Sequence, residues 1–169
     1  MVTMHLQMSV NELLGYTQGE RDKWEQWFNA RPPVACDAPV QREGNFNDVW
    51  RLMEHIFVVE KRHTQRLKQE SPLTEQTGAS HGDLGALFDF GRAVRQELTR
   101  FIDSANDADF GRIIEVRFLD QCFTLTARKL IFHTQFHEVR HWAQIATAVR
   151  NAGYPPPGYH DLLFSDALP

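Results

Sequence analysis

The sequence predicts an all-α fold in which residues 1–169 form one four-helix bundle. Four segments carry apolar residues at steps of three and four, which is the repeat of an amphipathic helix. Capping residues, prolines and glycines separate these segments, and one short stretch alternates in the way that a strand does. A chain of 169 residues can bury a core of its own, so we expect a single domain.

The first helix is predicted to begin at Ser9 and to end before Arg31. Ser9 and Glu12 have the spacing of a capping box, in which each side chain accepts a hydrogen bond from an exposed backbone amide. Two consecutive prolines after Arg31 stop the helix. Its apolar stripe consists of Val10, Leu13, Leu14, Thr17, Trp24, Trp27 and Phe28.

A second helix is predicted from an N-cap at Asn45 to about Gln69, after a proline-rich loop over residues 31–44. Its stripe consists of Val49, Leu52, Met53, Ile56, Val59 and Leu67. His55 lies on the flank of this stripe, so we expect it to face a neighbouring helix. Glu60 and His63 lie near the centre, where a buried polar group needs a partner.

A third helix is expected after the polar linker 71–78, with a capping box at Ser80 and Asp83. Its stripe consists of Leu84, Leu87, Phe88, Val94, Leu98, Phe101 and Ile102. The charged residues between them are expected to face solvent: Arg92, Arg95, Glu97 and Arg100.

From Asp107 the pattern changes, because apolar and charged residues alternate around Val116 and predict a small hairpin to about Phe123. The fourth helix is then expected from about Thr124 to Asn151, with Gly153 at its C-terminal cap. We expect the tail to dock on the bundle because it carries Tyr159, His160, Leu162, Leu163 and Phe164.

The fourth helix carries three histidines in register within LIFHTQFHEVRHWAQ: His133, His137 and His141. Residues four apart on a helix have Cβ atoms about 5–6 Å from each other, so neighbouring imidazoles can bind one ion. An apolar face is expected beside them, made of Leu125, Phe132, Phe136, Val139 and Ala143. Imidazole suits Zn²⁺, Ni²⁺, Fe²⁺ or Cu²⁺, and three such ligands leave a position for water or substrate. A metal bound in this way can turn water or a thiol into a nucleophile near neutral pH.

Two other classes of function fit the same residues. Glu60-Lys-Arg-His63 and Glu138-Val-Arg-His141 are both E-x-x-H, the ligand pattern of ferritin-like di-iron bundles. Such a site also needs a glutamate from each of the other two helices, and Glu20, Glu25 and Glu97 are candidates. The third class is a non-catalytic stress-response protein in which a metal only stiffens the bundle.

Composition limits the partners. The net charge of −4 and the absence of a basic stripe argue against nucleic acid. No apolar run is long enough to span a membrane and no signal peptide is evident, so we expect a cytoplasmic protein. Two cysteines form no disulfide framework. Trp50, Phe57 and Trp142 lie off the main stripes, which predicts a homodimer that covers them.

The segment His137-Glu-Val-Arg-His141-Trp-Ala-Gln144 resembles the H-x-x-x-H-R-G-Q signature of the DinB/YfiT-like family, and the resemblance covers about residues 9–165. It implies an up-down-down-up bundle that binds one divalent metal (Zn, Ni or Fe) through His55, His137 and His141. His133 would then be a second-shell or substrate-side group, and Gln144 either bonds a ligand or faces solvent.

Family members include transferases of low-molecular-weight thiols, a thiol-dependent isomerase and proposed hydrolases. The resemblance therefore implies a small-molecule substrate, with a thiol or water as nucleophile, and it assigns no catalytic residue. Trp142 and Ala143 replace the Arg-Gly of the signature, so the role of that arginine is either absent or taken by Arg140.

Overall fold

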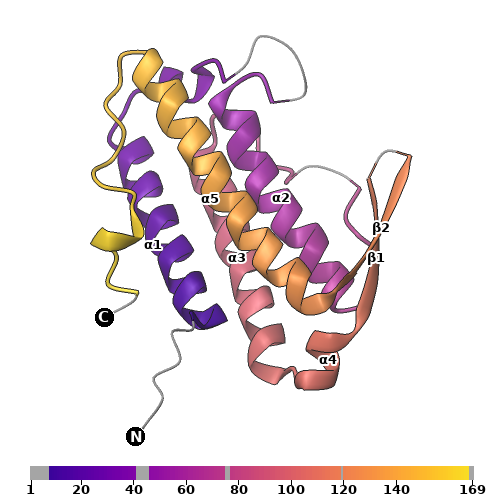
Figure 1. Cartoon of the computed structure of the whole chain (residues 1–169). Coiled ribbons are helices and arrows are strands. Elements are labelled where there is room, and N and C mark those ends of the chain that lie inside the picture. The colour runs from indigo at the N-terminus through magenta and orange to yellow at the C-terminus, as the bar shows by residue number, and fades with distance from the viewer. Residues whose placement is uncertain (1–7, 41–45, 75–76, 119, 168–169) are drawn as a thin grey trace, which may run out of the picture.

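A computed structural model describes residues 8–40, 46–74, 77–118 and 120–167. Four long helices in these ranges form the bundle: α1 (Val10–Asn29), α2 (Val49–Leu67), α3 (Leu84–Ser104) and α5 (Ala127–Asn151) (Figure 1). The shorter elements are η1 (Pro33–Asp37), α4 (Asp107–Gly111), β1 (Ile113–Phe118), β2 (Gln121–Thr126) and η2 (Leu162–Phe164). The predicted helical bundle with a small hairpin is confirmed.

The helices run up-down-down-up, as the positions of two buried apolar clusters show. One cluster joins the ends of α1 and α5 to the beginnings of α2 and α3, and includes Phe28, Val49, Leu87 and Val149. The other joins the opposite ends and includes Leu14, Leu67, Leu98 and Leu130. The first and last helices are therefore parallel to each other and antiparallel to the two between them.

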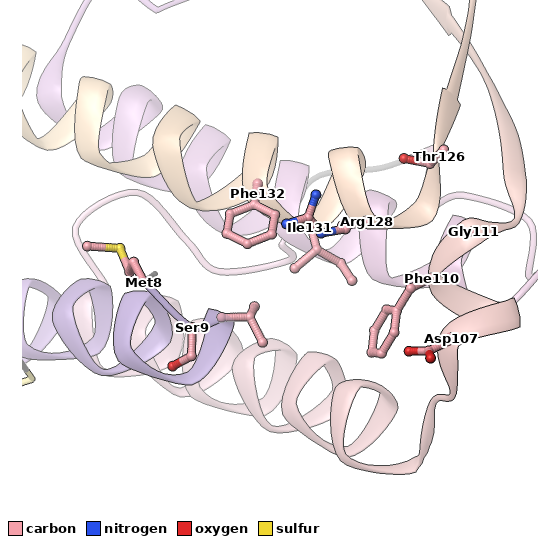
Figure 2. A pocket seen from close by; sticks show the side chains of 10 residues that line it. Met8, Ser9, Asp107, Phe110, Gly111, Thr126, Arg128, Ile131 and Phe132 are labelled. Atoms are coloured by element: carbon pink, nitrogen blue, oxygen red, sulfur yellow. The ribbon is translucent and has the colours of Figure 1, made fainter. Parts of the chain in front are cut away.

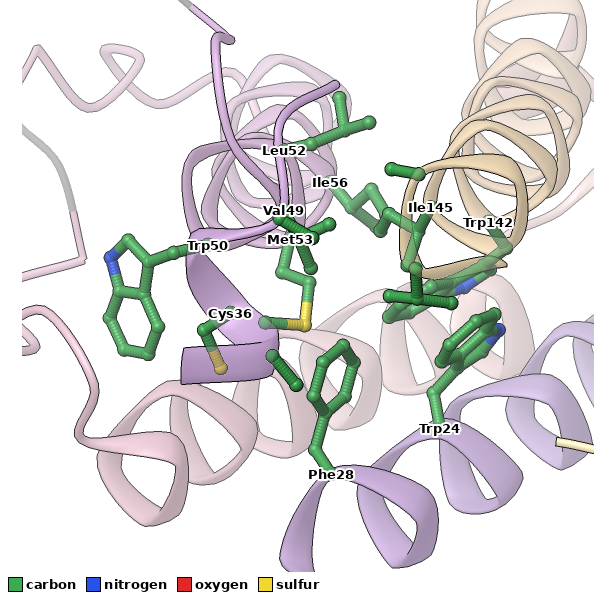
Figure 3. Packing of buried hydrophobic residues seen from close by; sticks show 14 of the residues in the cluster. Trp24, Phe28, Cys36, Val49, Trp50, Leu52, Met53, Ile56, Trp142 and Ile145 are labelled. Carbon is green, nitrogen blue, oxygen red and sulfur yellow. The ribbon is translucent and has the colours of Figure 1, made fainter. Parts of the chain in front are cut away.

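Aromatic side chains pack among aliphatic ones in the first cluster (Figure 3). Trp24 of α1 stacks on Trp142 of α5, with ring centroids 5.6 Å apart and planes 13° apart. Trp50, Phe57 and Trp142 are at most 2% exposed within the single chain, so the expectation that a partner subunit covers them is wrong. The reason is that α2 packs against α3, α5 and η1 at once, which buries residues on both sides of its main stripe. Dimerisation stays a prediction without this support.

Three helix starts differ from the sequence-based expectation. Asp48 caps α2 through the amide of Arg51, whereas Asn45 lies outside the described residues. Asp83, rather than Ser80, caps α3. Thr126 caps α5, which begins at Ala127, three residues after the expected start, because β2 continues to Thr126 in register with Ile113 of β1.

The connection after α3 begins with a helical turn that alternation did not predict. Asn106 caps α4 by accepting hydrogen bonds from the amides of Ala108 and Asp109, and the hairpin follows. The C-terminal tail does dock on α1. Tyr16 donates to the His160 carbonyl at 2.6 Å and Trp27 donates to the Pro155 carbonyl at 2.8 Å. The His160 ring also stacks on Trp24, with ring centroids 5.3 Å apart. The apolar residues expected to bury there are exposed: Tyr159, Leu162, Leu163 and Phe164.

Among the described residues, no helix combines the length and the apolar character that a membrane span requires.

Candidate metal centre

Three histidines from two helices bring a ring nitrogen each to one point. His55 comes from the middle of α2, and His137 and His141 come from successive turns of α5, which packs along α2 (Figure 1). The Nε2 atom of His137 lies 3.2 Å from Nε2 of His55 and 3.0 Å from Nε2 of His141. Within the described ranges, these three side chains form a group that could hold a metal ion, with all ligand atoms within 4.8 Å of one another.

The separations fit a shared metal ion. Metal–nitrogen bonds of about 2.0–2.1 Å that meet at about 90–109° separate adjacent nitrogens by about 2.9–3.4 Å. Hydrogen bonding alone satisfies the group poorly, because Nε2 of His137 faces two other ring nitrogens and carries either a hydrogen or a lone pair. A single hydrogen or a single lone pair on this atom can be directed at His55 or at His141 but not at both, whereas a cation accepts the lone pairs of all three nitrogens.

Gln144 fixes which nitrogen of His141 is free. Nδ1 of His141 lies 2.5 Å from Oε1 of Gln144, one helical turn further along α5. The amide oxygen is an acceptor, so Nδ1 carries the hydrogen and Nε2 carries the lone pair. Metal-binding histidines usually have such a partner on the second nitrogen, and it fixes both tautomer and ring orientation.

Burial favours the neutral form of all three rings, because it lowers the pKa of each. Burial, together with the neighbouring His141 and the positive charges of Arg62 and Arg140, lowers the pKa of His55 to about 4. Burial is also the main cause that lowers the pKa of His137 to about 2. Burial lowers the pKa of His141 as well, although its bond to Gln144 acts in the opposite direction. A metal ligand must be an unprotonated imidazole, and this surrounding favours that form.

His63 and His133 extend the row of imidazoles beyond the three. The Thr134 hydroxyl donates to the Leu130 carbonyl at 2.8 Å, so it accepts at 2.9 Å from Nδ1 of His63. Burial and Arg66 lower the pKa of His63 to about 3. His133 is exposed, with its ring 5.6 Å from that of His63 and 5.8 Å from that of His137.

The apolar face predicted beside the histidine row is not the buried face of α5. Phe136 is 60% exposed, and Ala143 is exposed too. The helix instead turns a partly polar face into the bundle, including Thr134, Gln135 and Glu138. These residues have buried partners, which the apolar pattern of one helix does not reveal.

Comparison with known proteins agrees with this architecture. The sequence matches the DinB family over residues 4–167. The chain belongs to the DinB family. The fold is similar to that of the DinB-like protein YjoA from Bacillus subtilis, with a TM-score of 0.62, 13% identity, and coverage of 89% of this chain and 99% of YjoA. It is also similar to YfiT from Bacillus subtilis, described as a probable metal-dependent hydrolase with an unusual four-helix bundle topology. The TM-score is 0.67, with 16% identity and coverage of 89% of this chain and 93% of YfiT. A comparison with curated protein sequences gave no match.

In this DinB chain, a buried cluster of charged side chains lies inside the bundle, next to the candidate metal centre in the sequence of α5. It takes one residue from each long helix: Arg21 of α1, Glu60 of α2, Arg95 of α3 and Glu138 of α5. Glu138 accepts two hydrogen bonds from Arg21, at 2.6 and 2.7 Å, and one from Arg95 at 2.7 Å. Arg21 also donates a hydrogen bond to Glu60, and Nε of Arg95 lies 2.9 Å from Oε1 of Glu60. Two cations and two anions make the cluster neutral.

This cluster corrects two sequence-based expectations. Arg95 was expected to face solvent, yet it is 6% exposed. Glu60 and Glu138 were candidate di-iron ligands, yet guanidinium groups occupy their carboxylate oxygens, so neither is free to bind metal. The sequence did hold a signal at Glu60 and Arg95, because Ile56 and Leu98 of the apolar stripes lie four and three residues away from them.

The cluster also sets the rotation of α5. The indole of Trp142 donates to Glu138 at 3.0 Å, so residues 138 and 142 point into the bundle together. The neighbouring positions 137 and 141 are thereby turned toward α2, where His55 lies. Pairing of Glu138 with two arginines therefore positions the two histidines of α5.

Two pockets adjoin α5. The larger, about 550 Å³, lies between the starts of α1 and α5, and Phe110 and Arg128 are among the residues that line it (Figure 2). None of the histidines at positions 55, 63, 133, 137 and 141 lines this pocket. The smaller, about 430 Å³, lies against the second half of α5 and is lined in part by Arg140 and Gln144. Only the second therefore includes a residue that contacts the candidate metal ligands.

Proposed function

We propose that the chain is a metal-dependent enzyme that binds one divalent ion through His55, His137 and His141. It would use that ion to activate a low-molecular-weight thiol or water against an electrophilic small molecule. The observation that carries the proposal is the convergence of three Nε2 atoms, at 3.0 and 3.2 Å, from two packed helices. When bound, such an ion lowers the pKa of a coordinated thiol or water and so supplies a nucleophile near neutral pH.

The donor set favours a catalytic site over a structural one. Structural zinc sites are usually closed by four protein ligands, whereas catalytic sites use three and keep a position open. Three histidines form the group here, and no fourth His, Cys, Asp or Glu joins it among the described residues. A purely stabilising metal is therefore the less favoured alternative.

The chain's own cysteines are poorly placed to be the nucleophile. Cys36 is buried in the first apolar cluster, and burial raises the pKa of its thiol to about 11. Cys122 is exposed on β2, outside the histidine group. The nucleophile would therefore enter with the substrates. The description of YfiT as a probable metal-dependent hydrolase supports keeping water beside a thiol as a candidate.

Each residue near the site has a proposed role. Gln144 would hold His141 in the tautomer that presents Nε2, and Glu138 would keep the rotation of α5. His133, which is exposed beside His137, would face the substrate side. A di-iron centre is disfavoured because its carboxylates would have to leave their arginine partners.

An activity screen on protein of known metal content tests the proposal. Glutathione, bacillithiol and mycothiol are each offered with one chloro-aromatic acceptor, and ester and amide hydrolysis are run in parallel. We expect an activity that chelation abolishes, that returns on adding metal, and that Cys36→Ser and Cys122→Ser retain. Turnover that persists in protein free of metal would contradict the mechanism.

A further inference from the structure

The 430 Å³ pocket continues the row of histidines toward the C-terminal end of α5. Gln144 and Ala148 follow His141 at steps of three and four, so they lie on the same side of the helix, one and two turns further on. One turn advances about 5.4 Å along the axis. Gln144 contacts both the row of histidines and the pocket, because it accepts the hydrogen bond from His141 and lines the pocket.

The described residues that line the pocket include one cation and no acidic group. Arg140 lines it, and the described residues offer this guanidinium neither an ion pair nor a hydrogen bond. The other lining side chains are apolar or neutral, including Val40, Thr147 and Asn151. In a chain with a net charge of −4, this pocket therefore places a positive charge, which has no partner among the described residues, beside the candidate metal centre.

We propose that this pocket binds a carboxylate-bearing part of the small-molecule substrate, with Arg140 pairing with the carboxylate while the reacting group lies at the three histidines. Arginine presents planar donors that match a carboxylate in two parallel hydrogen bonds. Gln144, Thr147 and Asn151 add neutral hydrogen-bonding groups around it. The volume is within the range of roughly 300–1,000 Å³ that small-molecule sites occupy. The inference rests on the proposed function and specifies the charge of its substrate.

Two thiols with the same carbon chain, one ending in a carboxylate and one in a neutral ester, test the inference: 3-mercaptopropionate and its methyl ester. Each is titrated into the Co²⁺-loaded protein, and binding is followed by calorimetry and by the cobalt–thiolate absorption band. We expect the anionic thiol to bind about tenfold more tightly than the ester, as one charge-assisted contact allows. In Arg140→Gln this preference should fall to less than about twofold, while Arg140→Lys should keep part of it.

Arg150→Gln is the matched control, because Arg150 is exposed on the same helix but does not line the pocket. It should keep the wild-type preference, and all three variants should keep the wild-type metal content. Equal affinities for the two thiols in the wild type, or an unchanged preference in Arg140→Gln, would overturn the inference and leave the proposed function standing.

Failure of metal loading in the wild type would instead contradict the proposed function. The pocket is then tested in the metal-free protein by nuclear magnetic resonance, with propionate and propionamide as probes. Shifts at the Gln144 and Asn151 side-chain amides that propionate alone causes, and that Arg140→Gln removes, support the pocket. Equal or absent shifts refute it.

Discussion

Replacing Glu138 by glutamine should destabilise the protein more than any exposed charge substitution. The side chain is 1% exposed and accepts three hydrogen bonds from two guanidinium groups. Glutamine keeps the shape but removes the negative charge, so two arginines then face only Glu60. Removing one partner of a buried ion pair costs about 3–5 kcal/mol, because a charge is left uncompensated.

That cost is large against a total stability of about 5–15 kcal/mol. For a chain of this size it corresponds to a fall in Tm of roughly 6–20 °C. Urea unfolding followed by circular dichroism measures the free energy directly. Glu97→Gln is the control, since Glu97 pairs with Lys61 at 2.7 Å but is partly exposed, and such pairs contribute about 0–1 kcal/mol. Equal losses in the two variants would refute the interpretation of the cluster.

The same variant predicts a change in pH dependence. Burial alone would raise the pKa of Glu138, but Arg21 and Arg95 outweigh it and hold this pKa below its ordinary value of 4.5. A carboxylate with a lowered pKa in the folded state contributes stability above about pH 4.5, and the contribution is lost as pH falls through the folded-state value. The difference between wild type and Glu138→Gln should therefore be constant near neutral pH and shrink below about pH 4.5. A difference that grows on acidification would contradict this sign.

Two further predictions follow from single contacts. Gln144→Leu should weaken metal affinity about 10–100-fold with little change in stability, because it removes the partner that orients His141. Calorimetric titration with metal measures this affinity. An unchanged affinity would argue against an orienting role for Gln144. Gly91→Ala should destabilise by about 1–3 kcal/mol, because a Cβ there would lie 3.0 Å from Phe57. A Cβ at Gly19 would have nothing within 4 Å, so Gly19→Ala should instead stabilise the protein by about 0.5–1 kcal/mol. Chemical unfolding that changes the stability of Gly91→Ala and Gly19→Ala in the same direction would refute the packing argument.

The helices and the histidine row could be predicted because they depend on local spacing. Two histidines four apart share a helix face wherever the helix forms, so the pairing of His137 with His141 follows from sequence. The place of His55 beside them depends on how α2 packs on α5. Periodicity placed His55 only at the rim of a stripe, and the resemblance to the DinB/YfiT-like family supplied the rest.

The buried charges could not be predicted in the same way. Arg21, Glu60, Arg95 and Glu138 come from four different helices, and each becomes acceptable in the core only because the others neutralise it. Seen one helix at a time, Arg95 looks like a solvent-facing residue and Glu138 looks like part of an E-x-x-H metal motif. Aromatic residues off the main stripes were misassigned for a related reason, since Phe57 is buried by contacts with Phe88 and Trp142 from other helices.

The metal content of the purified protein and of single histidine variants tests the central proposal most directly. Inductively coupled plasma mass spectrometry after loading and desalting should give one divalent ion per chain in the wild type and in His133→Ala, whose ring lies beside the group. His55→Ala, His137→Ala and His141→Ala should each lose the ion while keeping the helical circular dichroism spectrum. Stoichiometric metal in folded His137→Ala, or two ions per chain that depend on Glu60 and Glu138, would contradict the three-histidine site.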